Sequence, residues 1–402
     1  MFKLAFRNIF RHRGRTLLTL GAIVLGVASL ILTGGFVQDV FLQLREATIH
    51  SRLGHLQVYR QGYYEHGRRD PYAYLIKHPD QLASRLEGVP HVQDVMERLS
   101  FSGLLSNGRA NLPVVGEGVQ PAKEARLGGF VTMVKGRALR QEDRESIVLG
   151  EGVASALKLK PGDYATVLLN TPGGALNSMD FKVVGVFQSI SRDYDARAVR
   201  LPLKAAHELV NTAGVHSLVI SLDATRHTDA TAARITQLLP DQKYEVKTWR
   251  QLAGFYNKTV DLYRRQFLVL QVIILVLVLL GVANSVTITV HDRTGEFGTL
   301  MALGDPGFTV FRLLMVEFVL LGLLGSVLGV AVGAGLAEVI SAIGIPMPPP
   351  PNMNMGYVAQ IRLQPQVVGL AFTVGALATA LAAILPARRV AHLPVVEALR
   401  QN

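Results

Sequence analysis

Four long stretches without a formal charge dominate the pattern of apolar and polar positions along the chain. A helix that crosses the roughly 30 Å hydrocarbon core of a bilayer needs about 20 consecutive apolar residues. Each stretch is long enough, so the pattern predicts four transmembrane helices rather than buried helices of a soluble protein. The stretches cover residues 16–38, 266–291, 318–337 and 365–387.

Basic residues in the short flanking segments predict the orientation of these helices. Lys and Arg are concentrated in residues 1–15 and 388–402, and the segment between the second and third stretches holds Arg293 and Arg312. Cytoplasmic loops collect Lys and Arg, so both termini and that segment are expected in the cytoplasm. The long insert between the first two helices then lies on the other side of the membrane.

The insert has the pattern of an α+β domain. Short β-rich runs alternate with amphipathic helical runs and with turn signals. We expect two small mixed subdomains, one around 79–100 with 200–245 and the other around 110–190. The predicted strands are 55–59, 111–118, 146–150, 164–170, 180–187 and 216–222, and the predicted helices are 79–86, 152–159 and 231–239. Beyond the bilayer, residues 36–47 and 249–266 continue the helical pattern and predict a projecting stalk that contains Trp249.

Composition excludes several classes of chemistry. The chain has 41 Lys+Arg against 30 Asp+Glu, a net charge of +11, but most of this excess falls in the insert, so we expect no nucleic-acid partner. Cysteine is absent, which excludes disulfides and thiolate metal sites. No GxxxxGK[ST] or GxSxG motif occurs, so neither a P-loop nor a nucleophile elbow is predicted.

The remaining candidate sites have simpler interpretations. Asn211 stands where the sequence from His207-Glu208 would need a second zinc-binding histidine. Asp193 and Asp195 lack the further ligands of a calcium loop and are interpreted as solvated. Glu317 and Glu338 lie near the ends of the third stretch, where water and head groups are expected to solvate them. The histidines are scattered, and no catalytic or metal-binding residue is predicted.

Glycines recur every four positions from Gly325 to Gly333 in the third stretch, with Gly322 alongside. Such a ridge allows helices to approach closely in lipid, either within the chain or against a second subunit. The ridge consists of Gly322, Gly325, Gly329 and Gly333.

The cytoplasmic segments carry a family resemblance. Residues 1–15 have the pattern of an interfacial amphipathic helix, residues 292–304 read DRTGEFGTLMALG, and the chain ends PARRVAHLPVVEALR. These segments, with SIVLGEGVASALKLKPGDYATV and FKVVGVF in the insert, resemble the MacB/LolC/LolE/FtsX superfamily of ABC-transporter permeases. Met301 in place of a basic residue, the position of Pro394 and the Pro/Met-rich segment 345–357 depart from the family pattern.

The resemblance implies a permease without its own nucleotide site. ATP and Mg²⁺ would be bound by a separate cytosolic ABC ATPase, expected in two copies, and this chain would bind no cofactor. A second permease copy or paralogue and the bilayer are the other implied partners. The segment 292–304 would be the coupling helix, and the residues expected to dock on the ATPase are Glu296, Phe297, Gly298, Leu300, Leu303 and Gly304.

Release of lipoproteins from the bacterial inner membrane is the leading expectation for the cargo, with a periplasmic lipoprotein carrier as a further partner. The chain length resembles the LolC/LolE type, the tail ends after its motif, and no fused ATPase precedes the first helix. The alternatives are a MacB-like efflux permease for hydrophobic compounds or peptides and an FtsX-like transmembrane signal transmitter.

The expected organisation places an α+β periplasmic core domain between the first two of four transmembrane helices. The expected parts are a cytoplasmic amphipathic helix (1–15), the first transmembrane helix and stalk (16–44), the core domain (45–248), the stalk and second helix (249–291), the coupling loop (292–309), the third helix (310–343), the Pro/Met-rich loop (344–364), the fourth helix (365–387) and the cytoplasmic tail (388–402).

Overall fold

The computed structural model describes residues 13–67, 69–128, 131–239, 243–349, 354, 356–392 and 394. The predicted amphipathic helix at 1–15 lies almost wholly outside the described residues, as does most of the tail beyond 392. The described chain divides into two units: residues up to Leu42 with Val260–Met347 and the segment from Val358, and Gln43–Thr259 with Pro348–Tyr357.

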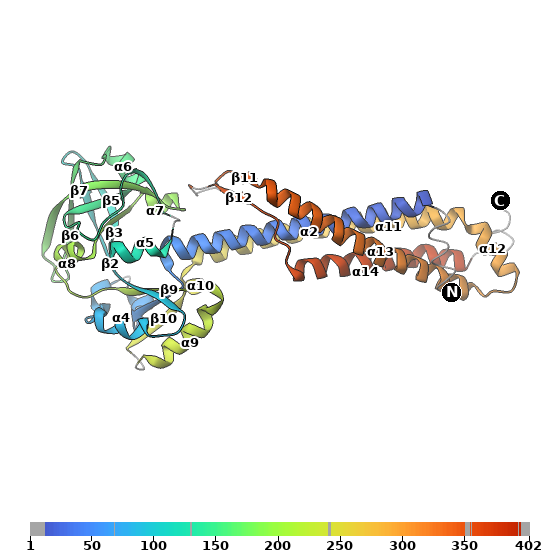
Figure 1. Cartoon of the computed structure of the whole chain (residues 1–402), viewed down its shortest axis with the longest axis horizontal. Coiled ribbons are helices and arrows are strands. Elements are labelled where there is room, and N and C mark those ends of the chain that lie inside the picture. The colour runs from blue at the N-terminus through green and yellow to red at the C-terminus, as the bar shows by residue number, and fades with distance from the viewer. Residues whose placement is uncertain are drawn as a thin grey trace. The chain divides into compact units, whose positions relative to one another are not determined.

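In the described part of the chain, four helices are long and apolar enough to cross a membrane. They are α2 (Arg13–Thr48), α11 (Gly254–Asp292), α13 (Gly307–Ile343) and α14 (Pro365–Ala391), and a short helix α12 (Thr294–Ala302) connects α11 to α13. These helices are labelled in Figure 1. The four predicted transmembrane helices are therefore present, each extending beyond its uncharged stretch.

Between α2 and α11, the described residues form one α/β domain around a 10-stranded sheet. The strand order is β10-β1-β9-β2-β3-β8-β5-β7-β4, with β6 paired to β2 and β7. The strands are β1 (Leu56–Arg60), β2 (Val92–Ser106), β3 (Asn111–Val119), β4 (Thr132–Gly136), β5 (Ser146–Gly150), β6 (Tyr164–Asn170), β7 (Leu176–Gln188), β8 (Ala198–Pro202), β9 (Ser217–Leu222) and β10 (Tyr244–Thr248).

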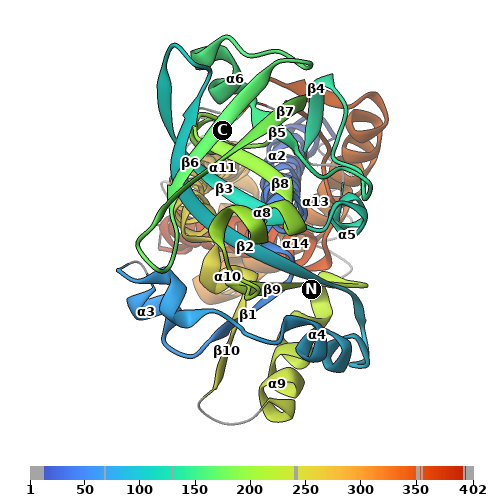
Figure 2. The same ribbon diagram turned by 90° about the vertical axis from the view of Figure 1, so that its left-hand side faces the viewer.

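Short helices flank these strands, as Figure 2 shows. A further short pair, β11 (Ile345–Met347) and β12 (Tyr357–Ala359), lies between α13 and α14 along the chain. The short helices are η1 (Ile49–Leu53), α3 (Tyr63–His66), η2 (Pro71–Tyr74), α4 (Pro79–Glu87), α5 (Pro121–Leu127), α6 (Glu151–Leu157), α7 (Arg192–Asp195), α8 (Leu203–Val210), η3 (Thr225–His227), α9 (Thr228–Leu238) and α10 (Trp249–Leu252).

Strand β2 joins the two halves of the domain. Its first part, from Val92 to Arg98, pairs with β9, and its second part, from Leu99 to Ser106, pairs with β3. One hydrophobic core includes Val95 from the first part and Leu105 from the second. The predicted grouping into two subdomains is corrected in two respects, because β2 belongs to both halves and β8 pairs with β3 and β5 rather than with the first group.

The structure also corrects the predicted stalk at Trp249. Trp249 is only 2% exposed and packs with Ile49 and Ala253, so it is a core residue of the domain. Helix α10 ends at Leu252 and α11 begins at Gly254, so no uninterrupted helix runs outward from Trp249. An indole buries a large apolar area, which explains why Trp249 lies in the domain core and not on a solvent-exposed helix.

Candidate functional site

The residues predicted to dock on the ATPase all lie on the short helix α12 or in the turn that follows it. Glu296 is exposed, Leu300 is half-buried and Leu303 is 81% exposed. Gly304 has φ +103°, a conformation that favours glycine, and its N–H donates to the carbonyl of Met301 to close the turn. The large apolar side chain that the segment exposes therefore lies at its C-terminal end.

Phe297, one of the predicted docking residues, is buried against the neighbouring helices. It is only 1% exposed and lies in one hydrophobic cluster with Val290, Leu314 and Phe318 from the long helices on either side. Gly298 is buried beside it. The spacing of Phe297 and Leu300 does put them on one side of the helix, but that side faces the protein. Phe297 is therefore buried within this chain, and its docking role remains a prediction.

A buried ion pair holds α12 in place. The Arg293 side chain donates to Glu317 over 2.7 Å and to Glu296 over 3.1 Å, and the Arg293 and Glu317 side chains are each only 4% exposed. The guanidinium also lies 5.0 Å from the ring centroid of Phe297. We call Arg293 and Glu317 the clamp, because together they join the start of α12 to α13.

The clamp corrects the prediction that Glu317 is solvated. A carboxylate removed from water is costly unless it is paired, and Arg293 supplies that pairing. Sequence reasoning missed Arg293, which was counted only as an orientation signal. The available signal was a pair of opposite charges: Arg293 directly follows α11, and Glu317 directly precedes the third uncharged stretch.

The glycine ridge of α13 lies against other helices of the same chain. A Cβ atom added at Gly325 would lie 2.8 Å from Ile23, and one at Gly329 would lie 2.7 Å from Val27, both on α2. Gly333 faces Ala28 in the same way, and Gly322 faces Thr379 of α14. The sequence left open whether the ridge packs within the chain or against a second subunit. The contacts described here are contacts within the chain.

A cavity of about 440 Å³ lies between α2, α11 and α14. Most of its lining is apolar, and the polar lining side chains are three glutamines. Leu268 and Val272 of α11 remain 59% and 50% exposed while lining it, so the cavity is open to the side. The glutamines are Gln38, Gln271 and Gln366.

A buried charge network stabilises the α/β domain. Glu117 is paired with Arg52 over 3.0 Å and accepts a hydrogen bond from the Tyr194 hydroxyl over 3.0 Å. Burial alone would raise the pKa of Glu117, but the guanidinium groups of Arg52, Arg98 and Arg200 outweigh it and lower that pKa to about 2. The network therefore keeps Glu117 ionised at neutral pH.

Asp195 is a further correction, because it is buried rather than solvated. It is 2% exposed and accepts hydrogen bonds from the backbone N–H of Ser189 at 2.9 Å and from the amide of Asn354 at 2.5 Å. Arg192 also donates to Asn354, over 2.9 Å. Asn354 belongs to the Pro/Met-rich loop, so this loop is bound to the α/β domain at that residue.

Comparison with known proteins identifies the family. A model of the MacB-like periplasmic core domain matches residues 16–238, more than half of the chain. A model of the FtsX-like permease C-terminal region matches residues 268–395. Both matches follow the order expected from the sequence resemblance and confirm it.

Individual relatives are distant. The lipoprotein-releasing system transmembrane protein LolE of Haemophilus influenzae is 22% identical over 269 residues, 65% of this chain and 64% of LolE. The macrolide export ATP-binding/permease protein MacB of Psychrobacter arcticus is 23% identical over 426 residues, 100% of this chain and 59% of MacB. The chain thus spans less than two thirds of the length of either relative.

Among solved structures, the periplasmic region of MacB from Actinobacillus actinomycetemcomitans is similar with a TM-score of 0.38 and 16% identity, covering 52% of this chain and 93% of that one. The family matches and the four membrane helices describe a multi-pass membrane protein with an extracytoplasmic domain. The chain belongs to the family of ABC transporter permeases that join a MacB-like periplasmic core domain to an FtsX-like permease region.

Proposed function

We propose that this chain is the permease of a lipoprotein-releasing ABC transporter in the bacterial inner membrane. A separate cytosolic ATPase, in two copies, binds ATP and Mg²⁺, and a second permease copy or paralogue completes the assembly. Hydrolysis moves the membrane helices and the periplasmic core domain, and the released lipoprotein passes to a periplasmic carrier. The single observation that supports this cargo is the laterally open cavity between α2, α11 and α14.

The lining of this cavity suits a lipid chain that carries polar linkages. Its volume of about 440 Å³ lies within the usual range of ligand pockets, about 300–1,000 Å³. An acyl chain fits the apolar wall, and the amides of Gln38, Gln271 and Gln366 can donate to ester or amide carbonyls. Because Leu268 and Val272 of α11 are exposed, the cavity can be entered from the bilayer. A lipidated cargo would use this route, and a water-soluble cargo would not.

Photocrosslinking tests the cargo. The permease, assembled with its ATPase in nanodiscs, receives a photoreactive phenylalanine at Gln271, and the matched control carries it at Ile288, an exposed residue of the same helix. A triacylated lipoprotein should crosslink at Gln271 and not at Ile288, and the non-lipidated form of the same protein should crosslink at neither. Equal crosslinking at both positions, or none at Gln271, contradicts the proposal.

The same preparation distinguishes the alternatives. A MacB-like efflux permease binds a hydrophobic compound or peptide that competes with the lipoprotein for Gln271, or replaces it entirely. An FtsX-like signal transmitter shows no cargo crosslink while ATP still changes the core domain. MacB of Psychrobacter arcticus matches the whole of this chain, so efflux is the alternative to test first.

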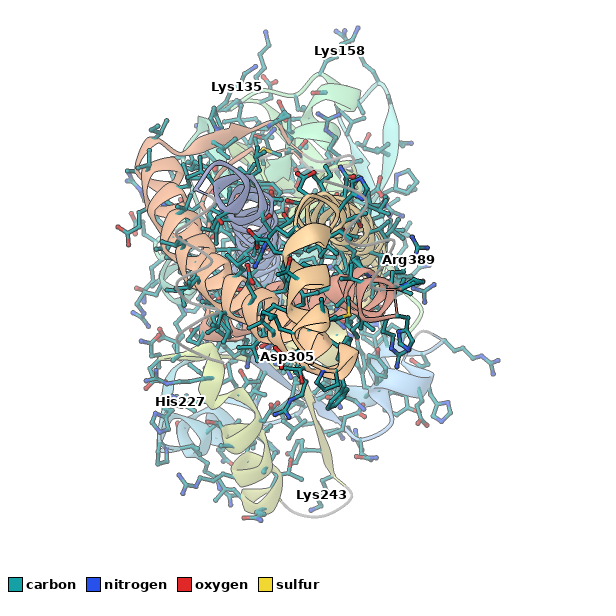
Figure 3. The ribbon with its side chains drawn as sticks, turned by 90° about the vertical axis from the view of Figure 1, so that its right-hand side faces the viewer. Lys135, Lys158, His227, Lys243, Asp305 and Arg389 are labelled. Carbon is teal, nitrogen blue, oxygen red and sulfur yellow. The ribbon has the colours of Figure 1, made fainter. Side chains whose placement is uncertain are left out.

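We propose that the ATPase docks on the C-terminal end of α12 and the start of α13. Leu303 and Phe308 are 81% and 67% exposed, and exposed apolar surface marks protein interaction sites. Asp305, labelled in Figure 3, lies between them in the sequence. Leu303→Asp should abolish pull-down of the ATPase while the permease still reaches the membrane. Leu385→Asp, which changes a leucine of α14 that is 70% exposed, is the control for the introduced charge. Normal pull-down with Leu303→Asp contradicts this assignment.

A further inference from the structure

Three side chains that are far apart in the sequence meet on the surface of the α/β domain. His91 lies in the turn between α4 and β2, Asp223 follows β9, and His227 ends η3 just before α9. One potential ligand atom from each side chain lies within 4.8 Å of the other two. Figure 3 labels His227. The scattered histidines of the sequence thus include one pair that the fold brings together.

The two imidazoles share the carboxylate. Nδ1 of His91 lies 2.9 Å from one oxygen of Asp223, and Nδ1 of His227 lies 2.7 Å from the other. The two ring centroids are 3.8 Å apart. Each imidazole is thus within hydrogen-bond distance of its own carboxylate oxygen. Two imidazole nitrogens therefore surround an anionic oxygen pair.

The backbone holds this arrangement at some cost. His91 has φ +71°, a left-handed conformation that a residue with a side chain rarely adopts. The N–H of Asp223 donates to the carbonyl of His91 over 3.1 Å and fixes the two segments together. Strained backbone of this kind is often retained where a side chain must be aimed.

We propose that His91, Asp223 and His227 form a binding site for a divalent first-row metal ion of the zinc class. Two imidazoles and one carboxylate, with an open position for water, are a ligand set that Zn²⁺ accepts. The His91, Asp223 and His227 side chains are 46%, 43% and 24% exposed, so an ion and its water can reach them. The bound ion joins the α4–β2 turn to the β9–α9 connection.

In the metal-free form, the position of Arg226 disfavours metal binding. Its Nε donates to Nε2 of His227 over 3.2 Å, which leaves the proton of the neutral ring on Nδ1. Metal binding through Nδ1 requires the proton to move to Nε2, where it faces the Arg226 donor. Arg226 is exposed and can swing away, but its positive charge and its hydrogen bond both compete with the cation.

Zinc titration of the full-length chain in nanodiscs tests the site, with a competing chelator dye and with metal analysis after gel filtration. The wild type should bind one Zn²⁺ per chain and should not bind Mg²⁺ at the same concentration. Asp223→Asn and His227→Ala should weaken binding by about tenfold or more, since even the loss of an outer partner of a ligand costs about 10–100-fold. His78→Ala, which removes an exposed histidine outside the cluster, is the matched control and should bind normally.

The variant Arg226→Ala distinguishes loss of the site from a folding defect. It should bind Zn²⁺ more tightly than the wild type, a gain that a damaged fold does not produce. Absence of stoichiometric Zn²⁺ from the wild type overturns the proposal. Unchanged affinity in both Asp223→Asn and His227→Ala, or weaker binding in Arg226→Ala, overturns it as well.

Discussion

Removal of one member of the clamp is the sharpest test of how α12 is held. Glu317→Gln keeps the size of the side chain but leaves the Arg293 guanidinium without its closest anion. Breaking a buried ion pair by removing one partner costs about 3–5 kcal/mol. Glu296 remains 3.1 Å from Arg293 on its exposed side and compensates in part, so we expect about 3 kcal/mol, the lower end of that range. This corresponds to a change of about 100-fold in the population of chains with α12 detached.

The absence of cysteine from the chain makes this population measurable. A single Leu300→Cys change places a thiol on the half-buried side of α12, next to the cluster that holds Phe297. Its maleimide labelling rate should rise by about 100-fold in Glu317→Gln if labelling requires α12 to detach. Under the proposed coupling role of α12, the ATPase activity stimulated by the permease should fall in the same variant.

A double variant distinguishes lost pairing from general damage. Arg293→Met with Glu317→Leu removes both charges, and replacing a buried pair by apolar residues of similar volume is often neutral or stabilising. Labelling of the Leu300→Cys thiol should return to the slow rate. Unchanged labelling in Glu317→Gln, or labelling in the double variant as fast as in the single one, refutes the clamp as the element that holds α12.

Three further predictions concern packing, pH and topology. Gly329→Leu should lower the free energy of unfolding in detergent by about 1–3 kcal/mol through overpacking, whereas Gly335→Leu, whose added side chain meets open space, should not; equal effects would contradict ridge packing within the chain. The folded pKa of Glu117 is lowered from 4.5 to about 2, so its contribution of about 3 kcal/mol is present above pH 4.5 and is lost as the pH falls toward 2. Glu117→Gln should therefore flatten the acid-unfolding curve of the domain between these pH values, and an unchanged curve would exclude the network as its cause. Reporter fusions at Gly108 and Asp305 should lie on opposite sides of the membrane, and same-side results would contradict the four-helix topology.

The membrane helices and their order could be predicted from the sequence because their signal is local. A helix in lipid satisfies its own backbone hydrogen bonds, so about 20 uncharged residues are sufficient to identify it. The strands at 146–150 and 164–170 were identified in the same way, from short β-rich runs next to turn signals. The long strand β2 was missed, because its first part carries Asp94 and Arg98, whose partners Arg126 and Glu124 lie on α5.

The tertiary structure alone decided which face of each element is buried and which distant charges meet. Phe297 and Leu300 are on one face by helical periodicity, but only the packing of α12 against α13 turns that face inward. Glu317 is separated from Arg293 by 24 positions, and His91 from Asp223 by 132. Local patterns describe a residue's neighbours within a few positions, whereas an ion pair or a ligand set depends on how whole elements are brought together, and this chain's sequence does not encode that in any single segment.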